Sequence, residues 1–243
     1  MSAVRNLLCA AGVLLVSGCL AGEPASGPGG AETEAREGLA AFFARGGPAG
    51  GPRKPPLARV SLAGGDVVVA GPDGYCIDPS TRRTAPERGF ALIASCHILS
   101  GGRAGRPVVP MLVTVTVGPR GDGPDLPTPK ALAQVANAKL LASKTASDRV
   151  VAHLGSGGDI MFDGSDPRYW RAAFLQGDRL VGLALYAPRG SALAGEQGAA
   201  MISRVRDRIA QLSAANPRRS VTPTQKPTGG WLGRLFNRQD LPQ

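Results

Sequence analysis

The chain is poor in the residues that build metal centres and acid–base sites. Its 243 residues include only two histidines and four cysteines. That supply leaves little material for a metal cage. Aromatic side chains make up 5% of the sequence. Beyond the N-terminal segment, no apolar run reaches the roughly 18 residues of a membrane-spanning helix, which argues against a span elsewhere.

Glycine and proline, by contrast, are plentiful at 34 and 21 residues, and apolar residues make up 43% of the chain. So much Gly and Pro is too much for a uniformly compact domain and far too little for collagen. The apolar fraction is typical of globular proteins, which excludes disorder along the whole chain. One folded domain with flexible flanks is therefore expected.

The N-terminus has the order of features of a secretory leader. Arg5 gives a short positive segment, and residues 7–16 form an apolar run of about ten residues, short for a membrane span. The run ends in Val16-Ser17-Gly18-Cys19, where small residues let a peptidase bind an extended chain and the thiol can be acylated. This segment resembles the lipobox of bacterial lipoproteins. An ordinary secretory peptide and an uncleaved anchor are the alternatives.

The lipobox resemblance implies that residues 1–18 are a signal peptide and that Cys19 becomes a lipidated N-terminus carrying acyl chains such as palmitate. Two or three chains anchor a protein stably, at about 0.8 kcal/mol per buried methylene. The same resemblance implies that Leu20, in place of Asp, favours the outer over the inner membrane. We therefore expect a lipid-anchored protein of the bacterial cell envelope that faces the periplasm and meets no nucleic acid.

Composition divides the rest of the chain into three parts. Residues 19–57 are rich in Gly and Pro, which is typical of a flexible tether. Residues 58–213 have the periodic apolar patterns of a globular domain. Residues 214–243 form a basic tail in which a Pro- and Thr-rich linker precedes a short apolar cluster.

Within residues 58–213, apolar periodicity predicts several strands and two helices. Strands are expected at residues 66–70, 74–78, 89–96, 109–117, 150–154 and 159–162. Thr128 followed by Pro129 predicts a helix start, as a cap and a first-turn proline. The stripe expected to be buried on that helix is Leu132, Val135, Ala136 and Leu140. A final helix is expected from about Ser191, with a buried face of Leu193, Met201, Ile202, Val205, Ile209 and Leu212.

The clearest local pattern is a hairpin around Gly177-Asp178, a two-residue turn that matches the twist of paired strands. A shifted register would break up the apolar face that this turn creates. The facing pairs predicted by the turn are Phe174 with Val181, Ala172 with Leu183, and Trp170 with Leu185.

These elements predict an α+β domain, an antiparallel sheet packed with a mid-sequence helix and a C-terminal helix. Their order over residues 60–213 resembles the PsbP-like fold, an α/β/α sandwich found in bacterial lipoproteins and photosystem accessory proteins. No residue motif accompanies this resemblance, so it implies no functional residues. It implies a binding or assembly role, because proteins of this fold mostly act in that way.

Cys76 and Cys96 are the cysteines that remain after signal-peptide cleavage and acylation. In an oxidising compartment they are expected to form a disulfide. Two hairpins are possible for the intervening chain. The shortest loop would place Cys76 opposite Ala91, whereas a turn centred on Pro86 would place it opposite Cys96.

The alternative for these cysteines is catalysis with a histidine. Cys96 and His97 are adjacent, but neighbours on a strand point to opposite faces, which argues against their contact. His153 is a second candidate base, although nothing near it in sequence indicates an orienting acid. A metal site built from the histidines with Asp159 and Asp163 has no recognised ligand spacing. The sequence thus predicts no catalytic residue, metal site or cofactor.

The tail contains a short amphipathic segment. Trp231, Leu232, Leu235 and Phe236 fall on one face of a short helix. Exposed aromatic side chains on a linker need a surface that buries them. Three surfaces are possible: the chain's own domain, a groove on a partner, or a membrane interface. For a protein partner, Trp231 and Phe236 are the expected anchors.

Positive charge exceeds negative charge, with a formal net charge of +10 for the whole chain. Residues 58–213 hold 18 Lys and Arg against 13 Asp and Glu, a net charge of +5. In an envelope, anionic lipid head groups and cell-wall polymers are the matching partners. A solubilising surface is the other interpretation.

We therefore expect a membrane-anchored envelope lipoprotein that acts as a non-enzymatic binding or assembly module. An envelope protein or an anionic cell-wall or lipid molecule would be its partner. Two alternatives remain, a thiol-dependent periplasmic enzyme and a carrier of small molecules or lipids.

Overall fold

The computed structural model describes residues 54–122 and 124–216. The acylation site Cys19 and the tail residues Trp231, Leu232, Leu235 and Phe236 lie outside the described residues. So do residues 1–18 and most of the expected tether.

An antiparallel sheet of seven strands organises the domain, in the spatial order β3-β5-β6-β10-β9-β8-β7. In chain order these strands are β3 (Tyr75–Ile77), β5 (Gly89–Ser95), β6 (Leu112–Arg120), β7 (Leu140–Ala146), β8 (Arg149–Leu154), β9 (Tyr169–Gln176) and β10 (Arg179–Tyr186). The short strand β4 (Arg83–Thr84) also pairs with β5. A separate hairpin joins β1 (Val60–Leu62) to β2 (Val67–Val69) through the 3-10 turn η1 (Ala63–Gly65). The expected α+β class is confirmed.

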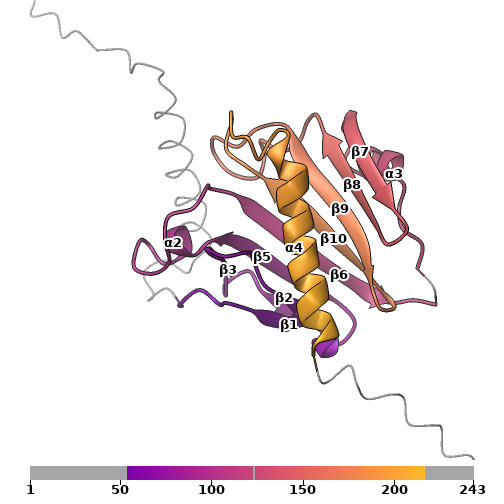
Figure 1. Ribbon diagram of the computed structural model, residues 1–243, viewed down its shortest axis with the longest axis horizontal. Helices are drawn as coiled ribbons and strands as arrows, with labels where there is room; N and C mark the ends of the chain where they lie inside the picture. Colours follow the sequence, from indigo (N-terminus) through magenta and orange to yellow (C-terminus); the bar gives the residue numbers. More distant parts are fainter. Residues whose placement is uncertain (1–53, 123, 217–243) are drawn as a thin grey trace, which may run out of the picture.

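The C-terminal helix α4 (Gln197–Ala214) lies diagonally across one face of the sheet (Figure 1). We call this the core face. The buried side chains of α4 and the β1–β2 hairpin pack there against the sheet. The end of α4 is tied to the hairpin, because the Val68 N–H donates to Ser213 Oγ at 2.9 Å and Asn216 Nδ2 donates to the Gly65 carbonyl at 2.6 Å. None of the helices within the described ranges is long and apolar enough to cross a membrane.

The hairpin of β9 and β10 has the predicted register. Its three expected pairs face one another, and the Gly177-Asp178 turn connects the strands. The alternation predicted for residues 109–117 is confirmed from Val113 onward, since Val113, Val115 and Val117 are buried and Thr116 is exposed. Val109, the first residue of the predicted pattern, lies before β6 and is 51% exposed. The three buried valines belong to the core face.

The strand expected at residues 159–162 is wrong. This segment is a turn, held by Ser165, whose hydroxyl donates to the carbonyls of Gly158 (2.9 Å) and Phe162 (2.6 Å). Phe162 is buried all the same, which explains why the apolar pattern suggested a strand.

The mid-sequence helix α3 (Pro129–Val135) begins as predicted, with the Ala131 N–H donating to Thr128 Oγ1 at 3.1 Å. Its predicted buried stripe is correct in part, since Leu132, Ala136 and Leu140 are partly buried against the domain and Val135 is not. Ala133 is its buried side chain, whereas Val135 is 81% exposed. The helix ends before Asn137, which takes a left-handed conformation at φ 48°. As a result Ala136 is the cap, and Leu140 belongs to β7.

The final helix starts at Gln197 rather than near Ser191. Residues 191–196 instead form turns around Trp170, whose indole N–H donates to the Gly195 carbonyl at 3.0 Å. Gly198 is needed at this contact, because a Cβ there would lie 2.2 Å from the Trp170 ring. The predicted face is otherwise buried, apart from Leu212, which is half-buried.

The edge strand β7 was not expected from the sequence. Residues 141–146 are exposed on both faces of the sheet, so they show no alternation of apolar and polar positions. Its place is set by pairing with β8, as in the pair of Lys144 with Val151. The other edge of the sheet is extended by Leu57, which exchanges two backbone hydrogen bonds with Ile77.

Two small apolar clusters lie on the sheet face opposite α4, which we call the open face. One includes Leu99 of the short helix α2 (Cys96–Leu99), Phe162 and the β5–β6 side chains Leu92 and Leu112. In the other, Ala133 of α3 packs on β8 and β9. The remainder of the open face, over β6, β10 and β9, is covered by neither cluster.

Arg179 is a buried charge at one end of the sheet, with its side chain 3% exposed. Its Nε donates to Asp66 Oδ2 at 2.8 Å. Its two terminal nitrogens donate to the backbone carbonyls of Glu87 (2.9 Å), Gly118 (3.1 Å) and Pro86 (3.2 Å). One side chain therefore joins η1, the β4–β5 turn, β6 and β10.

Candidate functional site

The disulfide between Cys76 and Cys96 is present, with the two Cα atoms 4.9 Å apart. Neither expected hairpin is the one formed. Cys76 pairs with Ala94 in the strand register, and Cys96 is the first residue of α2, just beyond β5. The tight turn between β4 and β5 sets this register. In it the Ala85 N–H donates to the Arg88 carbonyl, and β4 pairs with the start of β5.

The histidines weighed as catalytic bases both face backbone carbonyls. His97 Nδ1 lies 3.2 Å from the Gly105 carbonyl oxygen, and His153 Nε2 lies 2.8 Å from that of Ala194. The His153 ring also stacks on Trp170 on the core face, with ring centroids 4.1 Å apart. With Cys96 in the disulfide, there is no thiolate here for a histidine to activate.

A metal centre is not evident in the part of the chain that the structure describes. There, no group of three or more His, Cys, Asp or Glu side chains could hold an ion. Asp159 and Asp163 are exposed in the turns that precede β9.

His153 gives the fold a dependence on pH. Burial lowers the pKa of His153, and Arg168 adds to this effect, while the Ala194 carbonyl and Asp166 oppose it. The folded protein therefore takes up this proton at a lower pH than the unfolded chain. The contribution of neutral His153 to stability is fully present above about pH 6.5, the ordinary pKa of histidine. It decreases as the pH drops toward the pKa of His153 in the folded protein.

We expect the urea concentration at the unfolding midpoint to decrease when the pH is lowered from 7.5 to 5.5. This decrease should be smaller in His153→Gln. Glutamine keeps a donor for the Ala194 carbonyl but does not titrate. The carboxylates titrate mainly below this range. Equal falls in both proteins would contradict the role of His153, and His97→Gln serves as the matched control.

A groove of about 480 Å³ lies on the uncovered part of the open face. Its floor follows from the strand register. Gly182 of β10 lies between Thr116 of β6 and Ala173 of β9, and in the next row Ala184 lies between Thr114 and Arg171. Small residues at the centre of three strands therefore hollow out the sheet surface. We call this the open-face groove.

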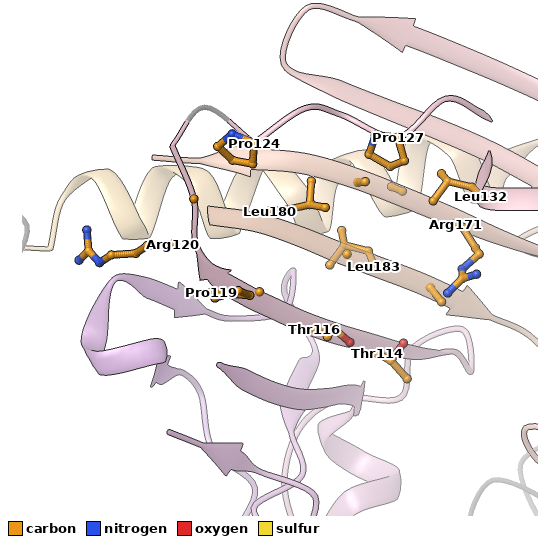
Figure 2. A pocket seen from close by; sticks show the side chains of 16 residues that line it. Thr114, Thr116, Pro119, Arg120, Pro124, Pro127, Leu132, Arg171, Leu180 and Leu183 are labelled. Carbon is orange, nitrogen blue, oxygen red and sulfur yellow. The ribbon is translucent and has the colours of Figure 1, made fainter. Parts of the chain in front are cut away.

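Longer apolar side chains form the walls of the groove. Figure 2 shows Pro124, Pro127 and Leu132 along the connection between β6 and α3, with Leu180 on β10 facing them. At Gly182 an added Cβ would meet no atom within 4 Å, so the space above this glycine is open. Apart from two threonines and the arginines at its ends, the groove is lined by apolar residues and glycines.

Arg171 supplies positive charge at one end of the groove. In the described part of the chain, its guanidinium makes no hydrogen bond or ion pair. Beside it, the Tyr169 and Tyr186 rings stack with centroids 5.0 Å apart. Burial raises the pKa of both phenols, and the Arg171 charge opposes this shift.

Arg120, near the other end of the groove, has its charge balanced. It donates to Asp66 at 2.5 Å and lies 3.7 Å from Asp178. No carboxylate belongs to the residues that line the open-face groove. The site therefore has one uncompensated positive charge, at Arg171.

No protein-family model, curated protein or solved structure matches this chain. The function of this chain is therefore inferred from its own residues. The open-face groove was not predicted from the sequence. The one available indication was Gly182, an isolated glycine inside an otherwise apolar strand, which is typical of a close approach by a ligand or another backbone.

Proposed function

We propose that this chain is a lipid-anchored protein of the bacterial cell envelope and that its domain is a non-enzymatic binding module. The observation that carries the proposal is the open-face groove, an apolar hollow with a single uncompensated cation. Ligand sites in proteins commonly combine an apolar lining with a few placed polar groups. The disulfide supports an oxidising compartment, such as the periplasm.

The anchor in this proposal is acylated Cys19, next to Leu20, on the periplasmic side of the outer membrane. The net charge of +5 over residues 58–213 favours anionic surfaces nearby. Trp231, Leu232, Leu235 and Phe236 would provide a second contact with an envelope partner. A PsbP-like sandwich is the fold family that we propose, on the order of the elements.

The thiol-dependent enzyme has less support than the binding module. Its proposed nucleophiles form the Cys76–Cys96 disulfide, and its proposed bases bond to backbone carbonyls. The carrier hypothesis shares the open-face groove with the binding module. These two differ only in what occupies the groove.

Photocrosslinking in intact cells tests this proposal. A benzoylphenylalanine replaces Thr116 in the full chain, where the side chain is exposed within the groove. We expect an ultraviolet-dependent adduct, either of a protein or of a lipid, detected by mass spectrometry. The matched control places the same group at Ser143, which is exposed on β7 outside the groove. Equal or absent adducts at the two positions would rule out the groove as the binding site.

The same cells test the anchor. The unaltered chain is expected in the membrane fraction with an acylated N-terminal peptide that begins at Cys19. Cys19→Ser is expected to lose the acyl mass. An unmodified Cys19 in the mature protein would contradict the lipoprotein assignment and leave the groove assignment to the crosslinks.

A further inference from the structure

We propose that the open-face groove binds a single-chain anionic amphiphile, a molecule of the fatty-acid class, with its head group at Arg171 and its chain over Gly182. This inference rests on the proposed function and names the ligand of that same site. Three features support it: the charge of the groove, its shape, and a hydroxyl donor at the same end as Arg171.

The charge of the groove matches one negative charge. Arg171 has no carboxylate partner among the described residues, and no carboxylate lines the groove. Arg120 already contacts Asp66 and Asp178. A cationic or zwitterionic ligand would leave Arg171 unmatched or bring a second positive charge toward it. A monoanion pairs with it directly.

The shape of the groove suits an unbranched chain. From Thr114 to Gly118 the floor follows five residues of β6, whose four steps span about 14 Å at the usual rise of an antiparallel strand. In its centre the floor has Gly182, Ala184 and Ala173, which project little or nothing above the sheet. A volume of about 480 Å³ lies within the range of small-ligand sites.

A hydroxyl donor, Thr114, lies at the same end of the groove as Arg171. Thr114 lies one strand beyond Ala184 from Arg171, on the same face. Figure 2 shows the Thr114 and Arg171 side chains at the same end of the groove. A carboxylate head group accepts bonds from a guanidinium and from hydroxyls.

The direct test is calorimetric titration of laurate, below its micelle concentration, into the mature chain. Residues 19–243 with Cys19→Ser are used, so that no detergent competes for the groove. We expect saturable binding of one laurate per chain. Dodecyltrimethylammonium, with a chain of equal length and the opposite charge, is the matched ligand and should bind at least tenfold more weakly.

Two variants locate the ligand. Arg171→Gln should weaken laurate binding about tenfold, because it removes a charge-assisted hydrogen bond. Arg204→Gln, an equal change of charge on the exposed side of α4, should leave binding unchanged. Gly182→Leu should abolish binding by filling the groove. Its side chain enters open space, so the thermal midpoint should not fall.

Absent laurate binding, equal binding of the two detergent-like ions, or full binding by Gly182→Leu would each overturn the inference. These results are separable from failure of the proposed function. Adducts at position 116 in cells, without laurate binding, would retain a binding module and exclude this ligand class. Loss of both would exclude the groove altogether.

Discussion

Replacing Arg179 with Met is expected to lower the free energy of unfolding by about 3 kcal/mol, the usual loss when one partner of a buried ion pair is removed. Methionine keeps much of the apolar stem but leaves Asp66 and the carbonyls of Pro86, Glu87 and Gly118 without their shared donor. Urea unfolding followed by circular dichroism measures the change.

Arg120→Met is the matched control, because Arg120 binds the same Asp66 carboxylate. Its side chain is 55% exposed, against 3% for Arg179. Ion pairs in water contribute at most about 1 kcal/mol, so this variant should lose far less stability. Similar losses in both variants would mean that the Asp66 contact, and not burial of Arg179 among the carbonyls, stabilises this end of the sheet.

Removal of the disulfide is expected to cost about as much. Cys76 and Cys96 are 20 positions apart, and closing a loop of this size stabilises a protein by about 3 kcal/mol in the chain-entropy model. Cys76→Ala with Cys96→Ala should therefore unfold at a lower urea concentration than the oxidised protein. The β3–β5 pairing and the start of α2 should be affected most, because the bond joins them.

Reduction by dithiothreitol provides the control for this variant. It should bring the unaltered domain close to the stability of the double variant and leave the double variant unchanged. A midpoint that does not move on reduction would show that the link is absent in solution or makes no contribution to stability.

The elements that sequence predicted well are those where local chemistry and tertiary packing agree. The Gly177-Asp178 turn fixes the β9–β10 register by itself, and it also places Phe174 opposite Val181 in the core. Thr128 and Pro129 likewise start α3 through bonds within a single turn. In both cases the decisive interactions lie within a few residues along the chain.

Prediction failed where distant contacts decide the structure. β7 has no apolar face, and only its pairing with β8 makes it a strand. The stretch before α4 has helical spacing, but Trp170 of β9 requires a turn there. Val135 fits a helical stripe, yet α3 packs through the face that carries Ala133, and Val135 lies on the other side.

Sequence patterns could not predict the open-face groove, for a similar reason. Gly182, Thr116 and Ala173 come from three strands and are brought into one row only by the registers of β6, β10 and β9. Their small size has no periodicity that a single segment reveals. Nothing in the sequence likewise distinguishes Arg171 from the other arginines, because its neighbours come from other strands.

The contact of Ser213 with Val68 has a consequence for the order of folding. It joins residues 145 positions apart, the last turn of the final helix and an early hairpin. When the chain is synthesised or exported N-terminus first, the apolar sheet surface that α4 buries stays exposed until almost the whole domain is available to fold. Such long-range closure is slow, and the half-made sheet is prone to aggregate in the meantime. A holding chaperone that shields this surface would thus act late, up to the moment when α4 docks.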